Sequence, residues 1–302
     1  VHDFNGDGRL DLFVAQRGPD GSRDVRLNQG DGTFRPRDLG NETRGCTRNV
    51  VFADFDGDGL IDSYHSVSAF GTNHNGSELH RGRPDGTFGP DIIETVLDPP
   101  VEDFWYKQAH GPDGLTGKWA NKQFKSALVR DLDGDGRPDL VTGAYADRGF
   151  QDPRNPSWAR GWVNRQDRGI FLLHNRSESG KVRFAEVAKS AIGEDAYGST
   201  DRDWNVYSLV PLDYDRDGDF DLFASAVVRR AGRRRREDTR SLGFFENISE
   251  PGKVTFVDRT EEAGFARFNE LPPRRRTERS FAAGAPIDFD NDGFVDLCLV
   301  NR

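Results

Sequence analysis

A nine-residue pattern rich in aspartate recurs five times along this chain of 302 residues and constrains its fold more than any other feature. The copies, called here the first to fifth Asp loops, span residues 3–11, 54–62, 131–139, 213–221 and 288–296. Each has oxygen-bearing side chains at positions 1, 3, 5 and 9 and a glycine at position 6. So many acidic groups in one short loop repel one another unless a cation offsets their charge. The pattern therefore predicts a set of metal-binding loops.

The residue types in the Asp loops favour calcium. Ca²⁺ takes carboxylate ligands at alternate positions and a backbone carbonyl at position 7, and glycine at position 6 allows the sharp turn. We expect up to five Ca²⁺ ions, with Asn5 removing one charge from the first loop and the Asp219 side chain, at position 7, facing solvent. The predicted ligands are Asp3, Asn5, Asp7, Arg9, Asp11, Asp54, Asp56, Asp58, Leu60, Asp62, Asp131, Asp133, Asp135, Arg137, Asp139, Asp213, Asp215, Asp217, Asp219, Asp221, Asp288, Asp290, Asp292, Phe294 and Asp296.

Two other structures compete with this interpretation of the Asp loops. An EF-hand needs helical flanks and a bidentate glutamate at position 12. The residues at that position are Val14, His65, Thr142, Ala224 and Leu299. Asx turns cap hairpins without metal, but five copies with four convergent oxygen-bearing side chains each disfavour that explanation.

Short apolar runs flank the Asp loops, as at residues 50–53 and 220–225. Runs of this kind between Gly and Asp clusters are typical of strands, so each loop is predicted to be a hairpin turn. A second hairpin follows, most clearly at Asp85-Gly86, because Asp-Gly between extended runs favours a tight turn. Four antiparallel strands per repeat predict an all-β propeller in a single domain, 1–302. The expected blades are about 1–38, 47–96, 124–188, 205–258 and 279–302.

The Asp loops, with sequences such as Leu-Asn-Gln-Gly-Asp-Gly-Thr-Phe downstream at 27–34, resemble FG-GAP/VCBS repeats. That family includes the integrin α-subunit propeller and secreted proteins similar to cartilage acidic protein. Residues 256–265 are similar to the inter-blade linker of the secreted group. The resemblance implies a β-propeller, usually of seven blades, with calcium in the loop between the first and second strands of a blade. The first blade lacks most of its first strand and the fifth stops after its second, so we expect an incomplete piece of such a propeller.

The connections between predicted strands differ greatly in length. In a four-stranded meander the Asp loops and Asp-Gly turns share one end of the blade, so the long connections lie at the opposite end. Long loops in compact domains are usually functional. Aromatic and imidazole side chains in these connections favour a face that binds a protein or glycan ligand, although the rings can instead pack together to stiffen the loops. They are Trp105, Tyr106, His110, Trp119, Trp158, Trp162, Tyr197 and Trp204.

The negative charge of the chain is concentrated in the Asp loops. They contain 20 aspartates, and removing these from the formal net charge of −9 would leave the rest of the chain at +11. A basic run from Arg229 to Arg236 suits an anionic glycan, and the alternative is solvated loop charge. No nucleic-acid-binding motif accompanies this run, so no nucleic-acid partner is expected.

Several classes of protein are disfavoured by what the sequence lacks. It has no G-x-S-x-G, H-E-x-x-H or Cys-x-x-Cys motif and no run of 18 apolar residues that would span a membrane. Cys46 and Cys298 are too few for a disulfide framework, and the apolar run around Cys298 predicts a buried free thiol. Four sequons would accept glycans in a eukaryotic secretory route. They begin at Asn41, Asn75, Asn175 and Asn247.

Two functions follow as hypotheses. The first is a secreted, periplasmic or cell-surface β-propeller that is stabilised by calcium and acts as a binding or adhesion module. The alternative is a polysaccharide-active enzyme, a lyase or hydrolase, with its site among the Trp-rich connections. Convergence of histidine, tyrosine, arginine and carboxylate side chains in one cleft would distinguish the enzyme from the binding module.

Overall fold

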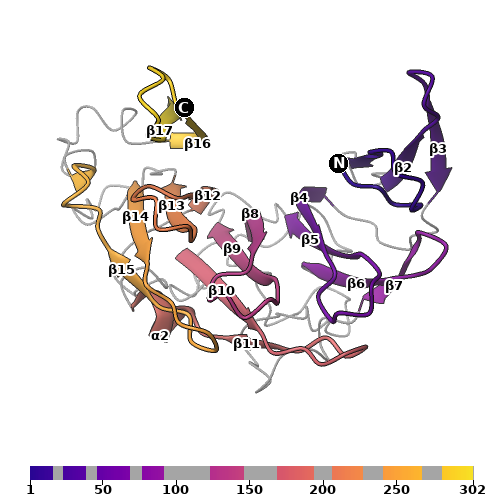
Figure 1. Ribbon diagram of the computed structural model, residues 1–302, viewed down its shortest axis with the longest axis horizontal. Helices are drawn as coiled ribbons and strands as arrows, with labels where there is room; N and C mark the ends of the chain where they lie inside the picture. The colour runs from indigo at the N-terminus through magenta and orange to yellow at the C-terminus, as the bar shows by residue number, and fades with distance from the viewer. Residues whose placement is uncertain are drawn as a thin grey trace, which may run out of the picture. The chain divides into compact units, whose positions relative to one another are not determined.

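A computed structural model shows antiparallel sheets throughout the part of the chain that it describes (Figure 1). The described residues are 1–15, 23–38, 46–68, 77–91, 123–145, 169–193, 206–226, 241–266 and 281–301. Within them there is one short helix, α2 (Ala188–Ile192). No helix in these ranges is long and apolar enough to cross a bilayer. The expectation of an all-β fold is therefore confirmed.

The strands form five sheets in which the order of neighbours follows the chain. Three sheets have four strands each, as the sequence predicted for complete blades. The first sheet contains β1 (Leu12–Ala15), β2 (Arg23–Asn28) and β3 (Phe34–Asp38), and the second contains β4 (Cys46–Ala53), β5 (Asp62–Ser68), β6 (Glu78–Gly82) and β7 (Phe88–Asp91). The third contains β8 (Gln123–Arg130), β9 (Asp139–Tyr145), β10 (Gly169–Asn175) and β11 (Phe184–Glu186). The fourth contains β12 (Val206–Leu212), β13 (Asp221–Ala226), β14 (Leu242–Asn247) and β15 (Phe256–Asp258), and the fifth contains β16 (Phe281–Ile287) and β17 (Asp296–Asn301).

The second to fifth Asp loops are hairpin turns between the first and second strands of their sheets. In the second, fourth and fifth loops the residue before the loop pairs with the residue at position 9, namely Ala53 with Asp62, Leu212 with Asp221 and Ile287 with Asp296. The first loop is closed by an isolated bridge between His2 and Asp11. Position 9 is therefore fixed by strand pairing at the mouth of the loop.

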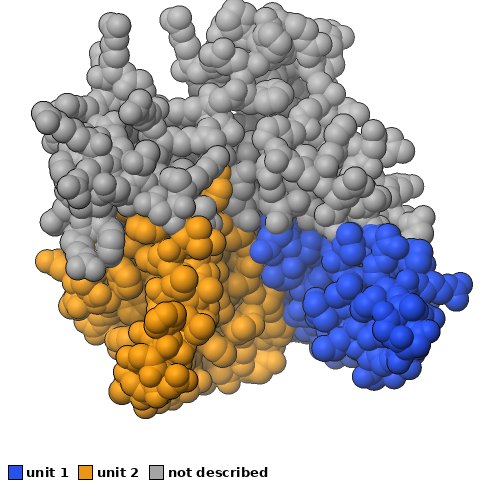
Figure 2. Space-filling model, turned by 90° about the horizontal axis from the view of Figure 1, so that it is seen from above, with its two compact units in different colours: residues 1–123, 175–185 blue, residues 124–174, 186–302 orange. Residues whose placement is uncertain are grey.

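The described chain divides into two compact units (Figure 2). Unit 1 comprises residues 1–123 and 175–185. Its core brings Phe4, Val25 and Phe88 together, and Phe52 packs against them. The ring of Phe4 meets that of Phe52 edge-on at 5.0 Å between centroids. Phe4 is position 2 of the first Asp loop, so this loop takes part in the core through its apolar second residue.

Unit 2 comprises residues 124–174 and 186–302. All residues of β13 are buried, as are all those of β10 that belong to this unit. Burial on both faces of a strand matches their near-continuous apolar sequences rather than an alternating pattern. Helix α2 buries Ala188, Ala191 and Ile192 in a hydrophobic cluster of this unit.

Cys298 lies on an exposed part of β17 and has a free thiol. The expectation of a buried thiol was wrong. Within the described residues β17 pairs only with β16, so the apolar run around Cys298 is not covered by a third strand. The apolar pattern identified the strand correctly but not the extent of its burial.

Phe223 offers a test of the core of unit 2. Its side chain is fully buried (0 % exposed) among Val210, Phe244 and Phe281. Replacement of a buried phenylalanine by alanine removes transfer energy and leaves a cavity, which costs about 3–5 kcal/mol. We expect Phe223→Ala to lower the free energy of unfolding by that amount in a denaturant titration. Phe289→Ala is the matched control, because Phe289 is 81 % exposed and its loss is expected to change stability by less than about 0.5 kcal/mol.

Candidate metal centres

The carboxylate at position 1 organises the backbone of the Asp loops. In the third loop, Asp131 Oδ1 accepts a hydrogen bond from the Asp135 amide at 3.1 Å, and Oδ2 accepts one from the Gly136 amide at 2.8 Å. The same pair of bonds recurs in the first, second and fifth loops. The glycine at position 6 has a positive φ in every loop, 86° at Gly136, which is a conformation that side chains disfavour. The backbone of each of these loops therefore folds around the carboxylate at position 1.

The carboxylate at position 9 joins the loop to the third strand of its sheet. Asp221 Oδ2 accepts a hydrogen bond from the Tyr214 amide at 3.0 Å, and Oδ1 accepts one from the Asn247 amide at 2.8 Å. Asp62 makes the equivalent bonds to Phe55 and Gly82. Burial raises the pKa of both carboxyls to about 6, despite these amide donors.

Carboxylates from positions 1, 3 and either 5 or 9 converge in the second to fifth loops. In each of these loops three such groups offer oxygens within 4.8 Å of one another, a spacing compatible with one shared cation. The first loop forms no such carboxylate trio, although all nine of its residues are described. Asn5 at position 3 accounts for this difference, because it replaces one carboxylate with an amide.

The fourth loop holds its carboxylates differently from the others. Its position 4 is Arg216, with φ 65°, where the first three loops have glycine. Asp213 Oδ1 and Asp219 Oδ1 are both buried and have no hydrogen-bond partner. Burial, together with the neighbouring Asp217, raises the pKa of Asp219 to about 7. The expectation that Asp219 faces solvent was therefore wrong, because its carboxyl is turned toward the other acids of the loop.

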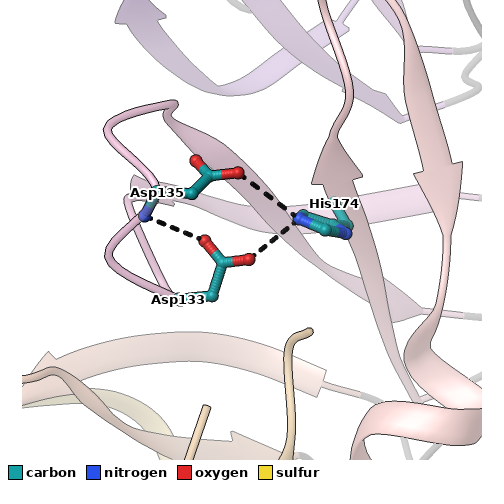
Figure 3. Close-up of side chains that lie close together, drawn as sticks. All are labelled: Asp133, Asp135 and His174. Carbon is teal, nitrogen blue, oxygen red and sulfur yellow. Dashed lines mark hydrogen bonds and ion pairs between the residues drawn. The ribbon is translucent and has the colours of Figure 1, made fainter. Parts of the chain in front are cut away.

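The sequence did not predict that one further residue would contact the acids of the Asp loops. This is the second-last residue of the third strand. In the second sheet this residue is Arg81, whose guanidinium lies 2.5 Å from Asp56 Oδ2 and 3.2 Å from Asp58 Oδ2. In the third sheet it is His174, and Figure 3 shows its ring facing Asp133 and Asp135. The signal in the sequence was its place directly before Gly82 or Asn175.

Each loop of the second and third sheets also contacts the hairpin that follows the third strand of the next sheet. Within unit 1, Asn175 Nδ2 donates to Phe55 O at 2.9 Å, and the Gly180 amide donates to Asp56 O at 3.2 Å. The ring of Phe55 meets that of Phe184 edge-on at 5.4 Å between centroids. Positions 2 and 3 of the loop therefore form a junction with a segment more than 100 residues away in sequence.

The same junction occurs within unit 2. Asn247 Nδ2 donates to Leu132 O and the Gly252 amide donates to Asp133 Oδ2, both at 2.8 Å. Leu132 packs in one cluster with Phe256, which begins β15. Asn175 and Asn247 are buried and their amide nitrogens are used in these bonds. The expectation that these two sequons accept glycans was therefore wrong.

The predicted ligand-binding residues lie outside the described part of the chain. This applies to Trp105, Tyr106, His110, Trp119, Trp158, Trp162, Tyr197 and Trp204. The basic run from Arg229 to Arg236 also lies outside it. The proposed binding face therefore stays a prediction from the sequence.

Comparison with known proteins identifies two stretches of the chain. Residues 3–64 match the model of an FG-GAP-like repeat, and residues 125–153 match that of an FG-GAP repeat. No curated protein matches the chain. The solved structure of an exotype rhamnogalacturonan lyase, YesX, is similar at 14 % identity and a TM-score of 0.27, over 94 % of this chain and 62 % of that chain. A likeness this weak carries no argument about activity. The two repeat matches include the first three Asp loops, so these stretches of the chain are FG-GAP-type repeats.

Proposed function

We infer that this chain is a calcium-binding β-propeller module in which the Asp loops hold Ca²⁺ for a structural purpose. The observation that carries this proposal is the fourth loop, where two carboxylate oxygens are buried without a hydrogen-bond partner beside other carboxylates. A buried polar atom without a partner costs about 1–3 kcal/mol, and more for a charged group. A bound cation would supply the missing partner and the compensating charge.

The donor set fits calcium better than other common cations. The loops offer carboxylate oxygens at alternate positions and a main-chain carbonyl at position 7, and Ca²⁺ takes six to eight oxygens in flexible geometry. Mg²⁺ demands a near-ideal octahedron and gives up its waters reluctantly, so a loop of this kind suits it less well. In the fourth loop the ion would be held by the carboxylates of Asp213, Asp215, Asp217 and Asp221 and by the main-chain carbonyl of Asp219. The Asp219 carboxylate would be a further oxygen donor.

A cation in an Asp loop would act on more than one hairpin. The position 9 carboxylate ties the loop to the third strand of its own sheet, while positions 2 and 3 contact the next hairpin. Neutralising the loop therefore favours both contacts at once. This coupling supports a role for calcium in maintaining the contacts of each loop rather than in chemistry.

We extend the proposal to a binding or adhesion role outside the cell. The support comes from the repeat family, from the lack of catalytic motifs in the sequence and from the aromatic residues predicted at the end opposite the Asp loops. The partner would be a protein or glycan. The enzyme alternative depends on residues outside the described ranges, and a glycan-array screen followed by a turnover assay on any bound glycan separates the two functions.

Removal of calcium tests the structural role. Extracellular calcium modules bind with a Kd of about 0.1–1 mM, so at about 1 mM Ca²⁺ a site with a Kd of about 0.1 mM stabilises the fold by about 1.4 kcal/mol. Three or more such sites would contribute about 4 kcal/mol or more. We expect EDTA to lower the melting temperature strongly in calorimetry, and added Ca²⁺ to restore it more effectively than Mg²⁺. An unchanged melting curve in EDTA would contradict the proposal.

The raised pKa values of Asp62, Asp219 and Asp221 predict a pH dependence for the metal-free protein. As the pH falls from 7 to 4, these carboxyls bind protons at a higher pH in the folded chain than in the unfolded chain. Stability therefore rises as the pH falls through this range. We expect a higher melting temperature at pH 5 than at pH 7.5 in EDTA.

With saturating Ca²⁺ the same comparison is expected to give no rise, or a fall, because protons then compete with the cation. The two titrations share one protein and one pH range, so calcium is the only variable. A rise of equal size with and without Ca²⁺ would count against cation binding by these carboxylates.

Asn247 tests the junction between the third Asp loop and the fourth sheet. Asn247→Ala removes the donor to Leu132 O and leaves a buried carbonyl unpaired, which costs about 1–3 kcal/mol. Asn28→Ala is the matched control, since Asn28 occupies the same strand-end position but donates at an exposed site to Leu10 O of its own loop. We expect Asn247→Ala to reduce the free energy of unfolding more than Asn28→Ala. Equal losses in the two variants would mean that the junction does not contribute.

A further inference from the structure

We propose that His174 converts the third Asp loop into a mixed nitrogen–oxygen site for a first-row transition-metal ion, with Zn²⁺ as the representative ion. The ligands from this chain are the His174 imidazole and the carboxylates of Asp133 and Asp135. The inference rests on the proposed function in one respect, namely that the Asp loops bind cations. It differs in assigning this loop a metal class that its all-oxygen counterparts do not favour.

The position of the imidazole is the first argument. His174 is only 3 % exposed, and its Nε2 atom is buried without a hydrogen-bond partner. That nitrogen lies 3.0 Å from Asp133 Oδ2 and 3.9 Å from Asp135 Oδ2. Figure 3 shows the ring of His174 directed toward both carboxylates. A buried nitrogen that faces two carboxylates without a hydrogen bond is placed for a ligand that accepts lone pairs from all three.

The distances between the three groups suit one shared ion. Zinc lies about 2.1 Å from nitrogen and carboxylate ligands. Two ligand atoms at that distance are about 3.0 Å apart at a right angle and about 3.4 Å apart at the tetrahedral angle. The observed 3.0 Å and 3.9 Å bracket the tetrahedral value. The side chain of Asp135 is 9 % exposed. A small rotation of this side chain would bring the 3.9 Å distance between Asp135 Oδ2 and His174 Nε2 closer to the tetrahedral value.

Hydrogen bonds from neighbouring amides orient the carboxylate of Asp133. Its side chain is fully buried, and the Gly252 amide donates to Oδ2 at 2.8 Å while the Asp135 amide donates to Oδ1 at 3.3 Å. Outer hydrogen bonds of this kind orient metal-ligating carboxylates. Asp135 Oδ2 also contacts the guanidinium of Arg137, whose side chain is 44 % exposed.

The chemistry of imidazole decides between metal classes. Imidazole suits Zn²⁺, Cu²⁺, Fe²⁺ and Ni²⁺, whereas Ca²⁺ and Mg²⁺ prefer carboxylate, carbonyl and water oxygens. One imidazole with two carboxylates neutralises a divalent charge and leaves positions for water. Asp133 also belongs to the carboxylate group with Asp131 and Asp139, so the same loop retains the oxygen set of a calcium site.

The corresponding residues in the other sheets show that this feature is specific to the third loop. The corresponding residue is Leu27 near the end of β2 in the first sheet, Arg81 in the second sheet and Glu246 in the fourth sheet. Arg81 brings a permanent positive charge to the second loop. A protonated His174 that merely pairs with the acids in the same way is the competing explanation, and the experiment below separates the two.

The test is isothermal titration of the metal-stripped protein with Zn²⁺ at pH 7.5, carried out with about 2 mM Ca²⁺ present to fill the oxygen-only loops. Wild-type protein and His174→Gln are compared, with His174→Leu as a second variant because leucine stands at the corresponding position in the first sheet. Arg81→Leu is the matched control at the corresponding position of the second sheet. Zinc-edge X-ray absorption on the wild type reports the ligand atoms directly.

We expect one Zn²⁺ per chain whose affinity falls at least tenfold in both His174 variants and is unchanged in Arg81→Leu. The absorption spectrum should show imidazole scattering in the wild type alone. Zinc binding that is equal in wild type and variants, or absent while Ca²⁺ still stabilises the protein, overturns this inference and leaves the proposed function intact. Failure of both Ca²⁺ and Zn²⁺ to bind or stabilise overturns both.

Discussion

The carboxylate at position 9 is the interaction on which the described structure depends most. Asp221 is 1 % exposed, and its two oxygens accept one amide from its own loop and one from the third strand. Two amide donors stabilise the charge, but burial outweighs them and raises the pKa of the group to about 6. The sheet therefore gains its connection between loop and third strand at an electrostatic cost that hydrogen bonds alone do not remove. A cation held by the same loop would offset that cost where it arises.

The Asp loops were expected to be turns, and the structure shows that they are also junctions. Leu132 packs with Phe256 and its carbonyl accepts from Asn247, while Phe55 makes the equivalent contacts with Phe184 and Asn175. The apolar side chain at position 2 therefore packs in the core, and the carbonyl of the same residue accepts a hydrogen bond from a hairpin of the next sheet. This double use accounts for the apolar residue between the first two acidic positions of these loops.

Much of this architecture could be predicted because its signals are local. The spacing of aspartates and glycines identifies the loops, and short apolar runs identify the strands on either side. The burial of Cys298 could not be predicted in that way, because it depends on whether another strand covers β17. Nor could the roles of His174 and Asn247, whose partners in the Asp loops lie about 40 and 115 residues away. Asp219 was mispredicted because its backbone role at position 7 was taken to decide the direction of its side chain.

The loops share a similar backbone but differ in charge, and part of the difference comes from one strand position outside the motif. Arg81 adds a positive charge to the second loop, and His174 adds an imidazole to the third. In the fourth loop burial raises the pKa of Asp215, and Glu246 adds a smaller contribution while forming an ion pair with Arg259 at 2.5 Å. The fourth loop also contains a fifth carboxylate and two buried carboxylate oxygens without a hydrogen-bond partner. A repeat motif can thus keep a similar backbone while the neighbouring residue near the end of the third strand changes the charge around each copy.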